Sequence, residues 1–431
     1  MTNFFKQSRH SLRHLLHVTA ATVLVLALAA QAHGQDGPDP NAASRQAQGG
    51  GYLPRLSGQN FSADTSWHLA GYADATFVFS DLDGESSSEF SRVRFNPAFH
   101  FQYQDLILFE AEMEIENTET GTEVVLEYAQ ANLLVHDNAV IVVGQFLSPV
   151  GQFQERLHPS WINRMADMPA GFGHGGAQPG SDTGIMVRGG FNLEPGLFTY
   201  SLAIGNGPRV GHEGDLELEA FNSDDNDDKA ISGRFGFMPR PNLEFGTSFL
   251  TASVTGLEVF DGGGDHVDAR AFGKLGNEEE HHELEPGEAD LFVWGLDMAF
   301  TEGPWDIRVE YLNSVRDPLN TAFEGATEVV AFEELRSTAW YAQMAYRLSG
   351  TAEFPALANF EPTIRYGEFE IEGHEELAEH SAEQRLDVGL NYWMSPTLVV
   401  RGVVQSREFT ARHEGEIDEE TRMLLQLSYG F

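Results

Sequence analysis

The chain has 431 residues, of which 26 are lysine or arginine and 66 are aspartate or glutamate, giving a formal net charge of −40 at pH 7. This charge argues against nucleic acid and against anionic membrane surfaces as partners, because both would repel the chain. The chain contains no cysteine, which excludes disulfide bonds, thiol catalysis and zinc–thiolate sites.

The first segment, 1–32, has the pattern of a secretory signal peptide. A basic start precedes an apolar run over 18–30, and the small residues Ala30 and Ala32 match a cleavage site. That run is too short for a spanning helix, which needs about 20 residues, although an uncleaved anchor is the alternative. Cleavage would leave 23 basic residues against the 66 acidic ones, a net charge of −43.

Residues 33–65 are rich in Gly, Pro, Gln, Ala and Ser, which predicts a flexible leader. From Ser66 to the end, apolar and polar residues alternate with the period of β-strands. In the last of these strands one face carries Met423, Leu425, Leu427, Tyr429 and Phe431.

A soluble β-sandwich would show the same alternation, but two features favour a membrane barrel. Glu110, Glu112, Glu114 and Glu116 share one face of a strand, and a water-filled lumen can hold four such carboxylates whereas a dry core cannot. Short and long connections also alternate, as periplasmic turns and extracellular loops do in outer-membrane barrels. The predicted fold class is therefore all-β, an antiparallel up-and-down transmembrane barrel over 66–431 in a bacterial outer membrane.

We expect about sixteen strands, and a barrel of that size encloses an aqueous channel rather than a filled interior. The expected strands are 66–80, 89–103, 105–117, 123–136, 139–149, 183–193, 197–205, 229–239, 242–254, 289–301, 304–315, 335–348, 360–371, 383–394, 397–411 and 420–431.

The sequence contains no catalytic motif with defined spacing, so we predict no enzymatic activity, no catalytic residue, no metal site and no cofactor. Charged residues instead gather on the polar face of the strands. They favour a lumen whose fixed charges set ion preference, although pairing among them during folding would produce the same pattern. The candidates for lining the pore are Arg92, Arg94, Glu110, Glu112, Glu114, Arg188, Arg234, Arg308, Glu310, Arg365 and Arg401.

The long connection near 150–182 is rich in glycine and proline, and we expect it to fold inward and narrow the pore; an external flap is the alternative. Its constriction candidates are Glu155, Arg156 and Arg164. Three other outer connections are strongly acidic, and we expect them to be solvated runs that concentrate cations at the pore mouth. These acidic runs are 213–228, 278–290 and 374–383.

Several short motifs resemble those of the phosphate-selective porin O/P family of Gram-negative bacteria. The segment 144–151, Gly-Gln-Phe-Leu-Ser-Pro-Val-Gly, is similar to the phrase that leads into that family's inward loop. The phrases Ser181-Asp182-Thr183-Gly184 and Leu69-Ala70-Gly71-Tyr72, and the terminal Phe431, are also similar.

The resemblance implies a sixteen-stranded trimeric porin that passes small anions along lumenal arginines. The candidates for these arginines are chosen because their side chains are expected to face the lumen, not because they match a motif. They are Arg92, Arg94, Arg188, Arg234, Arg365 and Arg401. The chain departs from the phosphate-specific pattern, because outside the predicted signal peptide its lysines are Lys229 and Lys274 alone. This departure and the net charge favour a general or cation-leaning porin.

We therefore predict passive diffusion of small hydrophilic solutes or ions, with selectivity set by lumenal Arg and Glu/Asp. The alternatives are a specific channel for phosphate or a divalent cation and, from another class, a barrel-borne enzyme or adhesin. The predicted partners are the solutes, outer-membrane lipid, a second and third copy in a homotrimer, and the barrel-assembly machinery, which would recognise Phe431. Nucleic acid is not expected as a partner.

Overall fold

The computed structural model describes the barrel and part of its connections. The predicted signal peptide, 1–32, and nearly all of the predicted leader, 33–65, lie outside the described part. The described residues are 60–62, 65–118, 121–173, 176–210, 216–218, 226, 228–256, 260–261, 265–266, 286–321, 329–350, 355–373, 380–411 and 417–431.

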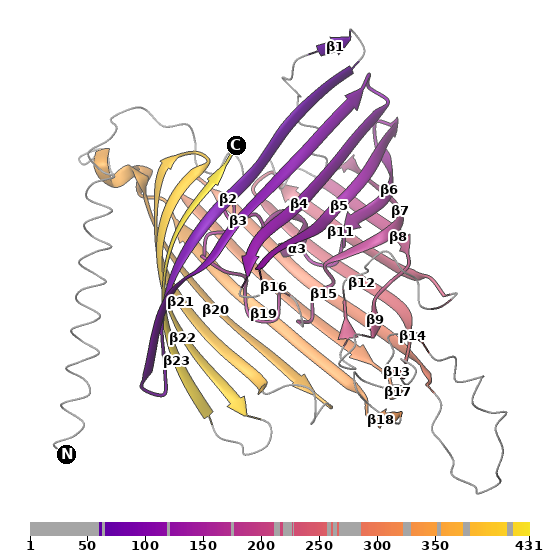
Figure 1. Cartoon of the computed structure of the whole chain (residues 1–431). Helices are drawn as coiled ribbons and strands as arrows, with labels where there is room; N and C mark the ends of the chain where they lie inside the picture. Colours follow the sequence, from indigo (N-terminus) through magenta and orange to yellow (C-terminus); the bar gives the residue numbers. More distant parts are fainter. Residues whose placement is uncertain are drawn as a thin grey trace, which may run out of the picture.

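Sixteen strands form a closed antiparallel barrel, as the sequence predicted (Figure 1). Every expected strand has a counterpart, and the largest difference lies at the start of β3, which begins at Glu85 rather than at 89. The strands are β2 (Thr65–Leu82), β3 (Glu85–Tyr103), β4 (Ile107–Thr118), β5 (Gly121–His136), β6 (Ala139–Leu147), β7 (Ser181–Leu193), β8 (Gly196–Gly205), β11 (Ala230–Arg240), β12 (Leu243–Thr255), β15 (Glu288–Glu302), β16 (Trp305–Arg316), β19 (Leu335–Tyr346), β20 (Phe360–Glu372), β21 (His380–Ser395), β22 (Leu398–Ala411) and β23 (Ile417–Gly430).

The barrel closes where β23 pairs with β2, with Tyr72 opposite Gly430 and Leu82 opposite Glu420. This closure leaves the first and last strands without a free edge, which an open sheet would expose to other chains. The short strand β1 (Asn60–Ser62) adds to the start of β2.

The connections at the two ends of the barrel differ in length, as predicted. Two-residue turns separate most strand pairs at the end where β2 begins, and short 3-10 helices η2 (Leu348–Gly350) and η3 (Pro355–Asn359) occupy a longer one. The long connections lie at the opposite end. They contain α3 (Phe153–Arg156) and the two-stranded pairs β9 (Arg209–Val210) with β10 (Leu216–Glu217), β13 (Phe260–Asp261) with β14 (Asp265–His266), and β17 (Leu319–Thr321) with β18 (Val330–Phe332).

The outer surface of the barrel is apolar, because alternate residues of each strand point away from the lumen. Ile185, Leu296 and Val388 expose about half of their side chains there, at 55%, 52% and 51%. A continuous apolar surface of this kind would be costly in water and is suited to lipid. Within the described residues, no helix is long and apolar enough to cross a membrane.

Candidate functional site

The described residues of the connection between β6 and β7, 148–173 and 176–180, lie inside the barrel and are called the inner loop here. Near its start, the amide of Gly151 donates to Oγ of Ser248 on β12 (3.0 Å), and the amide of Gln152 donates to Oε1 of Glu310 on β16 (2.8 Å). Gly151 has a φ of +75°, and a β-carbon there would collide with the Glu310 carboxylate. Glycine therefore allows the loop to approach the wall this closely.

Asp167 fixes the middle of the inner loop to the opposite wall. Its carboxylate accepts hydrogen bonds from Arg365 on β20 (2.9 Å), Arg385 on β21 (3.3 Å) and Gln405 on β22 (2.8 Å). Burial opposes this charge, but the guanidinium groups of Arg385 and Arg365 lower the pKa of Asp167 to about 2. Asp167 is therefore ionised at any physiological pH.

Main-chain carbonyl groups of the inner loop add further contacts with the wall on the side that Asp167 contacts. The carbonyl oxygen of Met165 accepts from Nη1 of Arg401 on β22 (2.6 Å), and that of Ala166 accepts from Nε2 of Gln426 on β23 (2.9 Å). The loop therefore crosses the whole lumen, from β12 and β16 to the strands that close the barrel.

Arg164 connects the inner loop to two carboxylates that lie on different strands. Its guanidinium nitrogens lie 3.7 Å from Asp306 on β16 and 3.5 Å from Glu361 on β20, and its Cζ lies 5.1 Å from the ring centre of Trp393. Buried pairs of this kind resist separation, because removing one partner leaves the other charged group without compensation.

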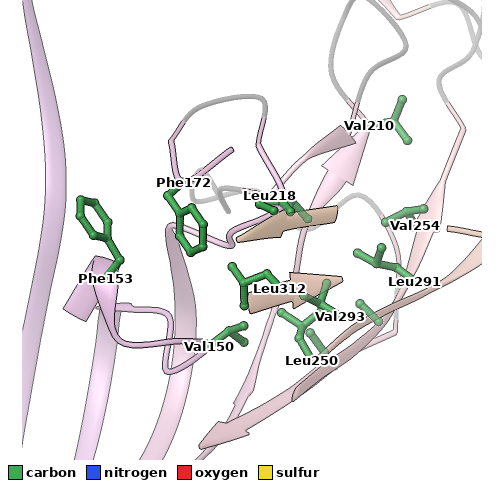
Figure 2. Packing of buried hydrophobic residues seen from close by; sticks show 14 of the residues in the cluster. Val150, Phe153, Phe172, Val210, Leu218, Leu250, Val254, Leu291, Val293 and Leu312 are labelled. Atoms are coloured by element: carbon green, nitrogen blue, oxygen red, sulfur yellow. The ribbon is translucent and has the colours of Figure 1, made fainter. Parts of the chain in front are cut away.

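A hydrophobic core fills much of the lumen on one side of the inner loop. Phe153 and Phe172 of the loop pack there with inward-facing residues such as Leu291 and Leu312, all of them buried (Figure 2). Val210 and Leu218, from the connection between β8 and β11, belong to the same cluster. The interior thus differs from the open channel expected for sixteen strands, because loops cover the apolar inward residues of β12, β15 and β16.

A cavity of about 500 Å³ lies between the inner loop and the wall formed by β2, β3, β4, β5 and β7. The wall lines it with His68, Tyr72, His100, Glu110, Glu112 and Tyr128. The inner loop lines it with Glu155, Arg156, His158 and Trp161. This cavity is the candidate functional site, because charged side chains of both the wall and the inner loop line it.

Two of the four glutamates of β4, Glu110 and Glu112, interact with histidines at the cavity. Nδ1 of His100 lies 3.4 Å from Glu110, and Nε2 of His158 lies 3.7 Å from Glu112. His158 belongs to the inner loop; burial opposes its charge, but the nearby carboxylate of Glu112 raises its pKa above the usual value. Glu112 thereby helps to hold the loop against β4.

Two arginines lie at the same cavity, and both already interact with glutamates. Nη1 of Arg156 lies 2.8 Å from Glu244 on β12. Nη1 of Arg188, on β7, lies 3.6 Å from Glu155, and its Nη2 donates to Oδ1 of Asn132 (2.8 Å).

The structure divides the candidates taken from the sequence into three groups. Those that line the cavity are Glu110, Glu112, Arg188, Glu155 and Arg156. Those buried within or beside the inner loop are Arg164, which belongs to it, and Arg234, Arg308, Glu310, Arg365 and Arg401 of the wall. The third group forms ion pairs along β3 and β4 away from the cavity and consists of Arg92, Arg94 and Glu114.

Comparison with known proteins gives matches to structures only. No family model matches the sequence, and no curated protein matches it. The barrel is similar to the outer membrane channel DcaP of Acinetobacter baumannii, with a TM-score of 0.54 and 12% identity over 87% of this chain and 100% of that one. It is also similar to an anion-selective porin from Comamonas acidovorans, with a TM-score of 0.53 and 10% identity over 85% and 100%.

A third similar structure is OprB of Pseudomonas putida, with a TM-score of 0.52 and 10% identity over 85% of this chain and 94% of that one. At these identities the likeness shows the fold alone. The fold is that of outer-membrane porins, and together with the apolar outer surface it places this barrel in a bacterial outer membrane. Membership of the phosphate-selective porin O/P family stays a prediction.

Sequence reasoning missed most of the aromatic and histidine residues at the cavity. His68, Tyr72 and His100 lie on the inward face of β2 and β3, so their facing was predictable, but nothing in the sequence separates them from other inward residues. His158 and Trp161 belong to an irregular loop, whose path has no periodic signal.

The acidic runs 213–228, 278–290 and 374–383 lie mostly outside the described residues, so their predicted role at the pore mouth stays a prediction. Across the part of the chain that is described, no group of three or more His, Asp or Glu side chains is arranged to hold a metal ion.

Proposed function

We propose that this protein is a porin through which small hydrophilic solutes or ions diffuse passively, and that the path runs between the inner loop and the β2–β7 wall. The observation that carries the proposal is the charged cavity of about 500 Å³ inside a closed sixteen-stranded barrel. Charged and hydrogen-bonding side chains on both sides of a cavity favour water and solvated ions.

The fixed position of the inner loop supports a permanently narrowed channel rather than a closed one. Asp167, Arg164 and Gly151 fasten the loop to strands on opposite sides of the lumen. The hydrophobic core blocks one side, so solutes would pass along the other side and meet Glu110, Glu112, Glu155 and Arg188.

Planar-bilayer recording with the purified full-length barrel tests the proposal. Stepwise, ohmic increases in current are expected on insertion, and heat-unfolded protein serves as the control. The absence of steps, with the barrel shown to be folded by its heat-modifiable migration, would contradict the proposal and favour a barrel-borne enzyme or adhesin.

An anion-specific channel, with phosphate as one substrate, is the second candidate, because Arg156 and Arg188 lie at the cavity. Phosphate would be held by guanidinium groups. Titrating inorganic phosphate into a chloride solution should then block the chloride current. A channel for a divalent cation would instead show block of the current when that cation is added.

We also propose a homotrimer surrounded by outer-membrane lipid, whose barrels reach the membrane through recognition of Phe431 by the assembly machinery. The apolar outer surface and the position of Phe431 at the closing strand pair support this arrangement. Cross-linking of the membrane-embedded protein would yield species up to the trimer.

A further inference from the structure

We infer that the cavity selects small organic cations, solutes that carry an ammonium or guanidinium group on an apolar or aromatic frame, and that Glu110 and Glu112 of β4 determine this selectivity. The inference rests on the proposed porin function and names the solute class for the same passage.

Most of the described lumenal arginines already form ion pairs with carboxylates of the protein. Arg156 interacts with Glu244 (2.8 Å), and Arg234 interacts with both Glu244 (2.9 Å) and Asp297 (2.6 Å). These two guanidinium groups and two carboxylates balance one another in a buried cluster. Arg156 therefore brings little net positive charge to the cavity, although its side chain lines it.

Arg365, on the opposite wall, is occupied in the same way. It binds Asp167 (2.9 Å) and Asp387 (2.7 Å) with its side chain only 1% exposed. Arg308 binds Asp306 (2.8 Å) and is equally buried. Such arginines hold the inner loop and the wall together and do not face a solute in the cavity.

Glu110 and Glu112 differ from these paired carboxylates. Among the described residues, the cationic groups within 4 Å of them are imidazoles, His100 for Glu110 and His158 for Glu112. Glu110 also accepts from the neutral amides of Gln130 (3.2 Å) and Asn132 (2.8 Å). The two carboxylates therefore keep most of their negative charge when the imidazoles are neutral.

One carboxylate oxygen at the cavity has no hydrogen-bond partner among the described residues. Oε1 of Glu112 is buried without one, since Nε2 of His158, the nearest cationic group, is 3.7 Å away; Glu112 lines the cavity and is 5% exposed. A buried carboxylate oxygen without a donor is costly, and a cationic donor entering the cavity would satisfy it. Glu110 and Glu112 alternate on one face of β4, about 7 Å apart along the strand, so one ammonium group can interact with both.

The rest of the cavity suits the apolar part of such a solute. Tyr72, Tyr128 and Trp161 present aromatic rings, and Ala70, Ala98 and Met186 add apolar surface. Aromatic faces attract ammonium and guanidinium groups by about 0.5–1 kcal/mol at exposed sites. A carboxylate pair beside aromatic rings favours organic cations over anions of the same size.

The charge balance at the passage is negative when histidines are neutral. Of the three carboxylates at the cavity, Glu155 lies 3.6 Å from the guanidinium of Arg188, whereas Glu110 and Glu112 have no guanidinium within 4 Å among the described residues. We therefore choose a pH of about 9 for the test, above the usual titration range of imidazole.

The test uses planar bilayers with the full-length barrel, a potassium chloride gradient and benzylammonium as the probe cation. The wild-type channel should have a reversal potential that indicates cation preference, and benzylammonium should reduce the potassium current. The double variant Glu110→Gln/Glu112→Gln should lower the cation-to-anion permeability ratio and the apparent affinity for benzylammonium by at least about threefold each, the scale of two weak charge interactions.

Two controls separate the local effect from others. Glu302→Gln removes the same charge from the exposed periplasmic end of β15, and it should leave both readouts unchanged. Benzyl alcohol has the same ring without the charge, and it should block much more weakly than benzylammonium. The single variants Glu110→Gln and Glu112→Gln provide the same readouts if the double variant does not fold.

A channel that conducts but prefers chloride, or whose selectivity and block are unchanged in the double variant, would overturn this inference and leave the porin function standing. A folded wild-type barrel that conducts nothing would overturn both. The two failures are therefore distinguishable in one series of recordings.

Discussion

Phe431 and Gly71 exchange two main-chain hydrogen bonds and thereby complete the barrel: the amide of Phe431 donates to the carbonyl oxygen of Gly71 (2.9 Å), and the amide of Gly71 donates to that of Phe431 (3.1 Å). Gly71 has a φ of +147°, and a β-carbon at this position would meet the Phe431 ring and the carbonyl of Asn96. The Phe431 ring stacks on Phe95, with 5.9 Å between the ring centres. The last residue of the chain is therefore part of the closure between β2 and β23.

Deleting Phe431 should lower the amount of assembled barrel in the outer membrane, because it removes this pair of hydrogen bonds and the terminal aromatic ring. Conductance per inserted channel should change little, since the ring stacks on Phe95, which is exposed on the outer surface. Heat-modifiable migration of membrane fractions measures assembly, and Phe431→Tyr is the matched control that retains the ring. Normal assembly with altered conductance would argue against this role.

Replacing Asp167 by Asn should loosen the inner loop and increase the channel's conductance and current noise.

The charged carboxylate of Asp167 has a lowered pKa of about 2. It therefore stabilises the folded barrel above its usual pKa near 3.9, and that contribution is lost as the pH falls towards about 2. The shift corresponds to about 2 kcal/mol. Unfolding of wild type and Asp167→Asn should differ at neutral pH and converge near pH 2; a constant difference would contradict this account.

The cation preference of the channel should rise as the pH increases through the titration of His158. Its raised pKa means that the ion pair with Glu112 is complete below the usual imidazole pKa of about 6.5 and is lost as the pH rises through the higher value. Loss of the pair frees the Glu112 charge. His100 and Glu110 lie at the same cavity, so reversal potentials should be compared between wild type and His158→Gln.

The variant His158→Gln should lose most of the rise, whereas His68→Gln, at the same cavity but without a carboxylate within ion-pair distance among the described residues, should retain it. An unchanged profile in His158→Gln would assign the pH response to other groups.

Phe172→Ala should destabilise the folded barrel by about 3–5 kcal/mol, because a fully buried ring would be replaced by a cavity in the lumenal core. Phe292→Ala is the matched control, since the Phe292 ring on β15 faces outward and is 48% exposed. The temperature at which the folded band disappears in gel migration should fall more for Phe172→Ala. Equal effects would mean that the core contributes no more than the lipid-facing surface.

The barrel could be predicted from the sequence because strand periodicity acts locally. Each strand shows alternation within its own residues, and the short turns that join neighbours determine which strands pair. The alternation of Met423, Leu425 and Leu427 with polar residues, for example, indicated the lipid-facing side of β23 without reference to any other strand.

The lumenal contacts could not be predicted in the same way. Asp167 and Arg365 are separated by 198 positions, and their contact depends on the path of an irregular loop and on the stagger of strands around the whole barrel. One signal in the sequence did indicate the core: Leu291, Phe292, Val293 and Trp294 form a continuous apolar run, which is typical of a strand covered on both faces.

The route of the solute is the central claim, and modification of single cysteines tests it most directly because the chain has none of its own. His100→Cys places a thiol at the cavity, and Thr363→Cys places one on the lumenal wall beside the inner loop, where the side chain is 4% exposed. A charged methanethiosulfonate reagent should sharply reduce the current through His100→Cys channels and leave Thr363→Cys channels unchanged. Block at Thr363→Cys, with His100→Cys unaffected, would contradict the proposed path.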